Sequence, residues 1–229
     1  MMLKGILFDF NGTLFFDSKL HMAAFRRIFP ELGKPVPSDE LMMQKFFGRT
    51  NETIYRSNID PDASASDIKA FIDAKENAYR ALCLEDPDSF RLVDGAAELL
   101  DYLKENNIPF CLATGSEFEN VRFYIEHLSI GRWFSEDNMV YENGTFKGKP
   151  APDIYQIAAK KIGLDPSECL VFEDGTSGVR SANAAGAGAV TLVYESGFPS
   201  PLTEETKVDG IYHDFKEWKN ILADYGLLR

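Results

Sequence analysis

The chain begins with a short, continuous apolar run that ends in a carboxylate. Ile6, Leu7 and Phe8 lead directly to Asp9, and a glycine turn follows at Gly12. A parallel strand that is buried on both faces has such a run, and ligands of parallel sheets bind at the carboxyl ends of the strands. The pattern therefore predicts a buried first strand with Asp9 at its functional end. An Asp at this place can also be a simple turn former, so a structural role stays open.

Two different patterns follow this strand. Between residues 16 and 88, apolar residues recur at three- and four-residue spacing, most clearly over 17–29 and 66–84, which predicts helices without a convincing strand. After residue 89, strand-like and helix-like stretches alternate, which indicates a parallel sheet with right-handed crossovers. We therefore expect an α/β protein whose core, 1–15 and 89–229, carries an all-helical insert at 16–88.

The alternating part also predicts where its elements lie. Gly144 marks a tight turn that would suit a small hairpin. Residues 208–212 predict an edge strand, and 215–222 predict a closing amphipathic helix. The other expected strands are 109–113, 169–172 and 189–194, and the other expected helices are 96–106, 119–128, 152–162 and 177–185.

Composition narrows the possible functions. With 229 residues, of which 45% are apolar, the chain can bury a sizeable core, and no apolar run is long enough to span a membrane. The net charge of −12 disfavours nucleic acid and anionic membranes as partners. Cys83, Cys111 and Cys169 stand far apart, so we expect reduced core thiols. Because no apolar run could span a membrane and the N-terminus has no small-residue cleavage site, we expect a cytoplasmic protein, and we expect it to be a monomer or weak dimer. An anionic substrate would need a local positive charge, such as a metal ion or one lysine.

Polar residues gather at the ends of the predicted strands or in the loops that follow them. In a parallel sheet of alternating strands and helices, these ends converge on one crevice. Each residue alone has a structural alternative, such as a helix cap or a solvated charge, but their shared placement favours an active site. The residues are Asp9 and Asn11 after the first strand, Thr114, Gly115 and Ser116 after the second, Lys149 before a helix, and Glu173 and Asp174 after a later strand.

Four segments in this order resemble the haloacid dehalogenase superfamily of phosphotransferases and hydrolases. They are DFNGTL, ATGS, GKPAPD and VFEDGTSG, and together they span nearly the whole chain. The helical stretch 16–88 resembles the cap domain of the subclass that includes beta-phosphoglucomutase-like and phosphoglycolate-phosphatase-like members. The resemblance implies a Rossmann-like core with a helical cap, and an enzyme that acts on a small phosphorylated metabolite. The motifs are specific for the superfamily but weakly specific for the substrate.

The resemblance also implies a role for each residue. Asp9 would attack phosphorus and form an aspartyl-phosphate, which divides one difficult displacement into two easier ones. Mg²⁺ prefers oxygen ligands, and the remaining roles are positioning and electrostatic. The implied catalytic residues are Asp9, Asn11, Thr114 and Lys149; the implied Mg²⁺ ligands are Asp9, the Asn11 carbonyl, Asp174 and Glu173, the last directly or through water; and the implied substrate contacts are Gly115, Ser116, His21 and Arg49.

Asn11 departs from the family pattern. Phosphatases and phosphomutases of this superfamily normally have a second Asp here, which gives a proton to the leaving group and later takes one from water. An amide has no titratable proton at neutral pH, and general acid–base catalysis is worth about 10²–10⁴ in rate. Three explanations stay open: an enzyme whose substrate has a good leaving group, such as an acyl phosphate, or which uses another acid; a degraded or regulatory member; or an Asn introduced to trap an intermediate.

Two residues of the cap complete the expected site. His21 lies twelve positions after Asp9 and resembles a cap histidine of the beta-phosphoglucomutase-like subclass, and Arg49 could pair with a substrate anion. A structural or solvated role is the alternative for both, whereas no role is expected for His127 and His213. The residues and the resemblance together lead us to expect a magnesium-dependent phosphohydrolase of a small phosphorylated metabolite that acts through Asp9. The alternatives are a sugar-phosphate mutase and a catalytically weak, phosphometabolite-binding or regulatory protein.

Overall fold

The computed structural model describes residues 2–47, 49–198, 200, 202 and 206–229. The chain divides into two compact units. The core unit comprises Met1–Phe16 and Arg91–Arg229, and the cap unit comprises Asp17–Phe90. The limits of the cap unit lie within two residues of those expected for the helical insert.

The core unit is organised on a six-stranded sheet in the order β3-β2-β1-β4-β5-β6. All neighbouring strands are parallel, so the structure confirms the α/β, Rossmann-like class that the alternating pattern predicts. The first strand of the chain lies inside the sheet, between β2 and β4. The strands are β1 (Gly5–Phe8), β2 (Phe110–Glu117), β3 (Met139–Glu142), β4 (Cys169–Glu173), β5 (Ala189–Val193) and β6 (Gly210–Tyr212).

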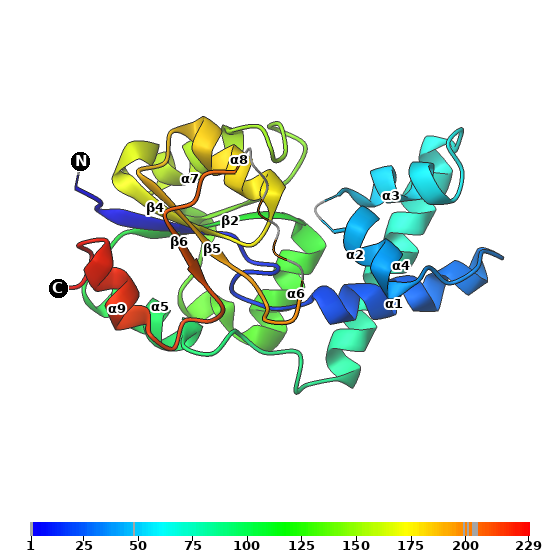
Figure 1. The fold of residues 1–229 in the computed structure, drawn as a ribbon, viewed down its shortest axis with the longest axis horizontal. Helices are drawn as coiled ribbons and strands as arrows, with labels where there is room; N and C mark the ends of the chain where they lie inside the picture. The colour runs from blue at the N-terminus through cyan, green and yellow to red at the C-terminus, as the bar shows by residue number, and fades with distance from the viewer. Residues whose placement is uncertain (1, 48, 199, 201, 203–205) are drawn as a thin grey trace. The chain divides into compact units, whose positions relative to one another are not determined.

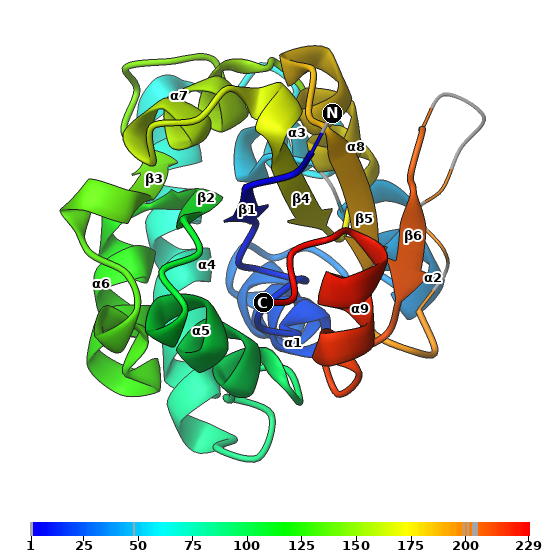
Figure 2. The ribbon, with the colours of Figure 1, turned by 90° about the vertical axis from the view of Figure 1, so that its left-hand side faces the viewer.

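Helices cover both faces of this sheet. Helices α7 and α8 lie on one face, and α5, α6 and α9 lie on the other (Figures 1 and 2). Short 3-10 helices connect some of these elements. The helices are α5 (Ala96–Glu105), α6 (Phe118–Leu128), α7 (Asp153–Lys161), α8 (Thr176–Ala185) and α9 (Trp218–Asp224), and the 3-10 helices are η1 (Ile130–Arg132), η2 (Glu136–Asn138) and η3 (Pro166–Glu168).

Strand β1 is apolar throughout because both of its faces are covered. Leu7 belongs to the cluster that α7 and α8 close with Ile154 and Val179. Phe8 points to the other face, where its ring centroid lies 6.4 Å from that of Phe215. Successive side chains of a strand point to opposite faces, so a strand covered twice needs an unbroken apolar run. The run ends at Asp9, whose amide still donates to the Phe172 carbonyl of β4 at 2.9 Å.

The sequence interpretation was wrong in three details. Strand β3 was not expected, and it pairs in parallel with β2, so the described residues near Gly144 form no hairpin, although Gly144 has a φ of +75°. Strand β2 is longer than expected and includes Thr114, Gly115 and Ser116, with a shift of register between Ala113 and Glu117. Helix α9 begins later than residue 215 because Phe215 is a fully buried core residue.

The described residues of the cap unit form helices and no strand, as expected. Three of the four helices begin at a side-chain cap, because Ser38, Thr50 and Ser64 each accept a hydrogen bond from an amide of the first turn. Ser64 and Asp67 form a complete capping box. The helices are α1 (Ser18–Glu31), α2 (Asp39–Lys45), α3 (Asn51–Asn58) and α4 (Ala65–Glu85).

The cysteines are core residues. Cys83, Cys111 and Cys169 are buried and free, as the sequence predicts. Burial raises the pKa of each thiol to about 12, so all three remain protonated near neutral pH. Separately, none of the helices in the described ranges is both long enough and apolar enough to cross a membrane.

Candidate active site

Asp9 lies directly after β1 and forms an ion pair with Lys149. The Lys149 Nζ is 2.6 Å from Asp9 Oδ1 and 2.6 Å from Glu173 Oε1. The exposed fractions of these side chains are 9% for Asp9, 13% for Lys149 and 2% for Glu173. Burial lowers the pKa of Lys149, but the charges of Asp9 and Glu173 outweigh it and leave that pKa above its usual value. The site therefore holds one fixed positive charge between two carboxylates.

Glu173, at the end of β4, is held by four hydrogen bonds. Its Oε1 accepts from Lys149 and from the Tyr155 hydroxyl, and its Oε2 accepts from the amides of Asp174 and Gly175 at 3.0 and 3.5 Å. Burial, followed by the negative charge of Glu173, raises the pKa of Tyr155 well above its usual value. Tyr155 is thus a protonated donor that orients Glu173. The sequence did not predict this role, because Tyr155 occupies an ordinary core position of α7.

Three carboxylates are close enough to share a cation. Asp9, Glu173 and Asp174 each offer a carboxylate oxygen, and these oxygens lie within 4.8 Å of one another. Gly12 makes room for Asp174, because a Cβ at Gly12 would lie 2.0 Å from Asp174 Oδ2. Gly12 also has a φ of +80°, which few other residues adopt without strain. Such a cluster of hard oxygen donors suits Mg²⁺ or a similar divalent cation.

Asn11 is held on both sides of its amide. Its Nδ2 donates to the Tyr124 hydroxyl at 2.8 Å, and its Oδ1 accepts from the Ser116 hydroxyl at 2.7 Å. Tyr124 is only 1% exposed, and its ring centroid lies 4.6 Å from that of Phe10. The structure thus brings together Asn11 and Ser116, two residues that the sequence nominated. It adds Tyr124, which the sequence did not distinguish from the apolar positions of α6.

Thr114 and Gly115 lie in β2, the neighbour of β1. The side chain of Thr114 is 1% exposed, and its Oγ1 accepts from the Ser116 amide at 3.1 Å. Gly115 is exposed, and a Cβ added to it would meet no atom within 4 Å. The expected contacts of these two residues with a phosphoryl group stay predictions.

His21 belongs to a polar network inside the cap unit. Its ring stacks on Tyr79 with the centroids 4.2 Å apart. Its Nδ1 lies 2.7 Å from Lys75 Nζ, and its Nε2 lies 3.1 Å from Asp17 Oδ2. Arg49, also in the cap unit, is exposed. The expected contacts of His21 and Arg49 with substrate stay predictions.

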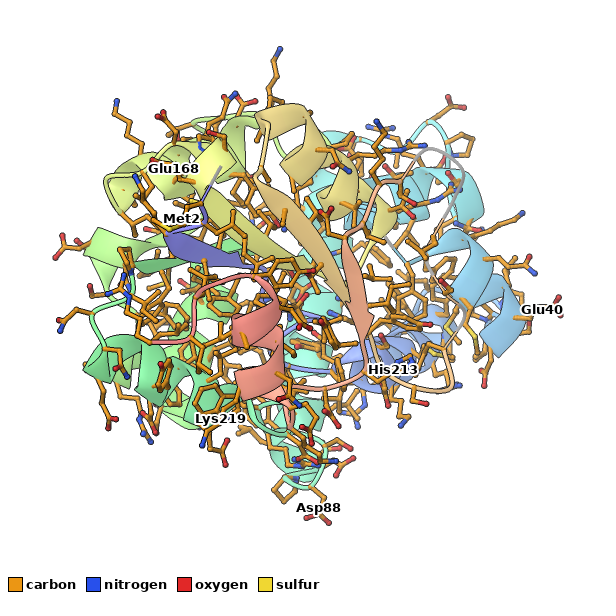
Figure 3. All side chains as sticks on the ribbon, turned by 60° about the vertical axis from the view of Figure 1, so that its left-hand side comes forward. Met2, Glu40, Asp88, Glu168, His213 and Lys219 are labelled. Carbon is orange, nitrogen blue, oxygen red and sulfur yellow. The ribbon has the colours of Figure 1, made fainter. Side chains whose placement is uncertain are left out.

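Three further charged or titratable groups of the core unit, His213, Glu168 and His127, make contacts of their own. His213 follows β6 and contacts the Tyr194 carbonyl through Nδ1 at 3.1 Å (Figure 3). Glu168 (labelled in Figure 3) precedes β4, at the opposite end of that strand from Glu173. Its Oε1 pairs with Lys4 Nζ at 2.5 Å. The His127 ring lies 4.7 Å from that of Phe123. The expected absence of a role for His127 and His213 stays a prediction.

Comparisons with known proteins agree with this geometry. The chain is 28% identical over 188 residues to the fructose-1-phosphate phosphatase YqaB of Escherichia coli K12, which covers 82% of this chain and 95% of the relative. It superposes on a crystal structure of an HAD hydrolase, family IA, variant 3, from Entamoeba histolytica, with a TM-score of 0.86, 36% identity and coverage of 94% and 95% of the two chains. A mutant of CbbY from Rhodobacter sphaeroides, in complex with xylulose-(1,5)bisphosphate, gives a TM-score of 0.79, 26% identity and coverage of 94% and 96%.

The family match spans the residues of the core site. The model of the haloacid dehalogenase-like hydrolases matches residues 3–186, a range that includes Asp9, Lys149 and Glu173. The parallel sheet, the placement of the four sequence motifs and the similarity to phosphatases agree with that match. The chain therefore belongs to the haloacid dehalogenase-like hydrolase family.

Proposed function

We propose that this protein is a magnesium-dependent phosphohydrolase that acts on a small phosphorylated metabolite through Asp9. The observation that carries the proposal is the Lys149 ammonium, fixed 2.6 Å from both Asp9 and Glu173 beside the carboxylate cluster. An anionic nucleophile can approach an anionic phosphoryl group only where positive charge offsets the repulsion. The phosphatase activity in the name of the Escherichia coli relative supports the same reaction.

The reaction would proceed in two displacements at phosphorus. A carboxylate oxygen of Asp9 forms a bond to phosphorus while the bond to the leaving-group oxygen breaks, which gives an aspartyl-phosphate. Water then attacks phosphorus, and the bond to Asp9 breaks to regenerate the carboxylate. Lys149 would orient Asp9 and offset charge on the phosphoryl oxygens, while Thr114 and the amide of Gly115 would contact those oxygens.

The residues that would hold Mg²⁺ are Asp9, Asp174 and the Asn11 carbonyl, with Glu173 assisting. Bound Mg²⁺ would neutralise negative charge on the transferred phosphoryl group. Both oxygens of Glu173 already accept hydrogen bonds from Lys149, Tyr155 and backbone amides. Glu173 would therefore serve mainly to position Lys149. We extend the proposal to His21 and Arg49 of the cap unit as contacts of the leaving group.

The test is phosphate release from a panel of small phosphate esters with Mg²⁺ and after its removal by EDTA. We expect turnover that needs Mg²⁺ and that falls by at least about 10³-fold in Asp9→Asn, which removes the nucleophile. Asp137→Asn removes the same charge at an exposed position and is the matched control. Calorimetry should show weaker Mg²⁺ binding in Asp174→Asn, independently of turnover.

The same panel separates the alternatives. A sugar-phosphate mutase would convert a sugar phosphate into its isomer with little free phosphate, which phosphorus NMR detects. A binding protein would be stabilised against heat by a phosphorylated ligand without any turnover. Phosphate release that persists in EDTA or in Asp9→Asn would contradict the proposed function.

A further inference from the structure

The protons close to Asp9 in the core unit are already engaged. Lys149 donates to Asp9 and Glu173, and the Tyr155 hydroxyl donates to Glu173. Asp174 belongs to the carboxylate cluster with Asp9 and Glu173. Thr114 and Ser116 offer only hydroxyls, which do not release protons near neutral pH. The protons of Lys149 and Tyr155 are therefore directed to carboxylates rather than to a leaving group.

The side-chain amide of Asn11 is held in place by hydrogen bonds at both its oxygen and its nitrogen. Ser116 donates to its oxygen and its nitrogen donates to Tyr124, so each end of the amide has a partner of the right polarity. Tyr124 is buried, and its ring packs against Phe10 and Phe15 with centroid distances of 4.6 and 6.0 Å. Because a buried hydroxyl is costly without a hydrogen bond, Tyr124 and Asn11 stabilise each other.

The cap histidine does not replace the missing acid. An ammonium donates and does not accept, so His21 Nδ1 accepts from Lys75, and the ring proton lies on Nε2. That Nε2 faces the Asp17 carboxylate, which also accepts from the Tyr79 hydroxyl at 2.7 Å. Both ring nitrogens are therefore engaged inside the cap unit, and the proton of His21 is directed to Asp17.

We propose that this site is built for phosphoryl donors whose leaving group departs without a proton, acyl phosphates above all, rather than for alkyl esters such as sugar phosphates. The proposal rests on the proposed phosphohydrolase function and names its substrate class. The bond from Asp9 to phosphorus forms, the bond from phosphorus to the leaving oxygen breaks, and its electron pair stays on that oxygen. An acyl phosphate then releases a carboxylate, which is stable as an anion because carboxylic acids ionise near pH 4. An alkyl ester would release an alkoxide, and hydroxyls such as that of water ionise only near pH 16.

The second displacement is common to all substrates. Water forms a bond to phosphorus, the electron pair of the broken bond returns to Asp9, and the proton of the water passes to phosphate or solvent. The leaving group therefore affects kcat/KM, which reports the steps up to the first cleavage, whereas kcat approaches a shared value when the second step is slow. A dependence of kcat/KM, but not of kcat, on the leaving group distinguishes the proposal from a general loss of activity.

The test is a leaving-group series with Mg²⁺ as the metal: acetyl phosphate, 4-nitrophenyl phosphate, phenyl phosphate and glucose 6-phosphate. For the protein with Asn11 we expect kcat/KM to fall by at least about 10²-fold from the first two substrates to the alkyl ester. Asn11→Asp should raise kcat/KM for the alkyl ester by about 10²–10⁴ and change that for acetyl phosphate by less than about tenfold. Asn220→Asp, which introduces the same charge on α9, should leave the series unchanged.

Two results would overturn the proposal. One is equal kcat/KM for the alkyl and aryl esters in the protein with Asn11, and the other is a uniform gain for all substrates in Asn11→Asp. The first result is measured without any variant. The leaving-group series therefore tests the proposal even if Asn11→Asp does not fold. Absence of turnover with every substrate of the series, acetyl phosphate included, would instead contradict the proposed function itself.

Discussion

Glu173 Oε1 lies 1.8 Å from the point at which a Cβ on Gly178 would stand. Gly178 is buried in the first turns of α8, and Glu173 ends the strand that precedes this helix. Glycine is unfavourable inside a helix by about 1 kcal/mol relative to alanine, so its presence here requires a reason. The reason is the close approach of a carboxylate that positions Lys149.

Gly178→Ala should lower kcat/KM by about 10- to 100-fold, because the added Cβ displaces Glu173 and, with it, Lys149. The measurement is phosphate release with Mg²⁺, together with circular dichroism to show that the fold persists. Gly131→Ala is the control, since a Cβ there would meet only Ile125 Cγ2 at 3.4 Å. Equal kcat/KM in the two variants would show that Glu173 needs no such space.

Tyr155→Phe should lower the free energy of unfolding by about 1.5–3 kcal/mol. The change removes a buried donor from a charged acceptor, Glu173, and such hydrogen bonds are stronger than neutral ones. Urea denaturation measures the effect. Tyr141→Phe, at a partly exposed position of β3, removes the same hydroxyl and should stay within about 0.5 kcal/mol. Similar losses in both variants would contradict the role of Tyr155 in holding Glu173.

Lys75→Met should destabilise the protein by about 3 kcal/mol, because it breaks a buried charged pair from one side. The Lys75 ammonium lies 2.8 Å from Glu76 and 2.7 Å from His21, and its side chain is 4% exposed. Lys69→Met, also on α4, breaks an exposed pair with Asp73 and should have no measurable effect. Urea denaturation of both variants tests this contrast. An unchanged free energy of unfolding in Lys75→Met would refute the prediction.

Alkaline pH should destabilise the protein through its buried thiols. Burial raises the pKa of Cys111 from its usual value near 9 to about 12, so the folded state favours the neutral thiol. This contribution is fully present below pH 9 and is lost as the pH rises toward 12. Between pH 8 and 10.5, the fall in the free energy of unfolding should be smaller in Cys111→Ala, by at most about 2 kcal/mol. Identical pH slopes in urea denaturation would rule out this contribution.

The sequence predicts the parallel sheet well because its strands are buried on both faces. The unbroken apolar runs of β1 and β4 are typical of strands in the interior of a sheet, and both strands are fully buried. Strand β3 was missed because it has four residues, of which only Met139 and Val140 are buried. The length of β2 was missed because Thr114 to Ser116 resemble a loop, and their place in the strand depends on pairing with β3.

The sequence likewise predicted only part of the candidate site. The convergence of Asp9, Lys149 and Glu173 follows from the rule that parallel strand ends meet at one edge. Tyr124 and Tyr155 could not be identified, because an aromatic residue at a helical core position fits packing equally well. Only the tertiary structure shows that the two hydroxyls point to Asn11 and Glu173. Helical periodicity predicts which face of a helix is buried, but not which polar atom a buried hydroxyl meets.

The position of β1 inside the sheet has a consequence for biosynthesis. Ile6 pairs with Phe110 and Leu7 pairs with Val171, so β1 leaves the ribosome before both of its neighbours and waits for them. The cap unit, Asp17–Phe90, is contiguous and is complete before either neighbour has been translated. We therefore expect the nascent chain to carry a helical segment together with an apolar strand that has not yet paired. While the strand is unpaired, its exposed apolar residues favour aggregation, so we expect a chaperone to bind the chain at this stage.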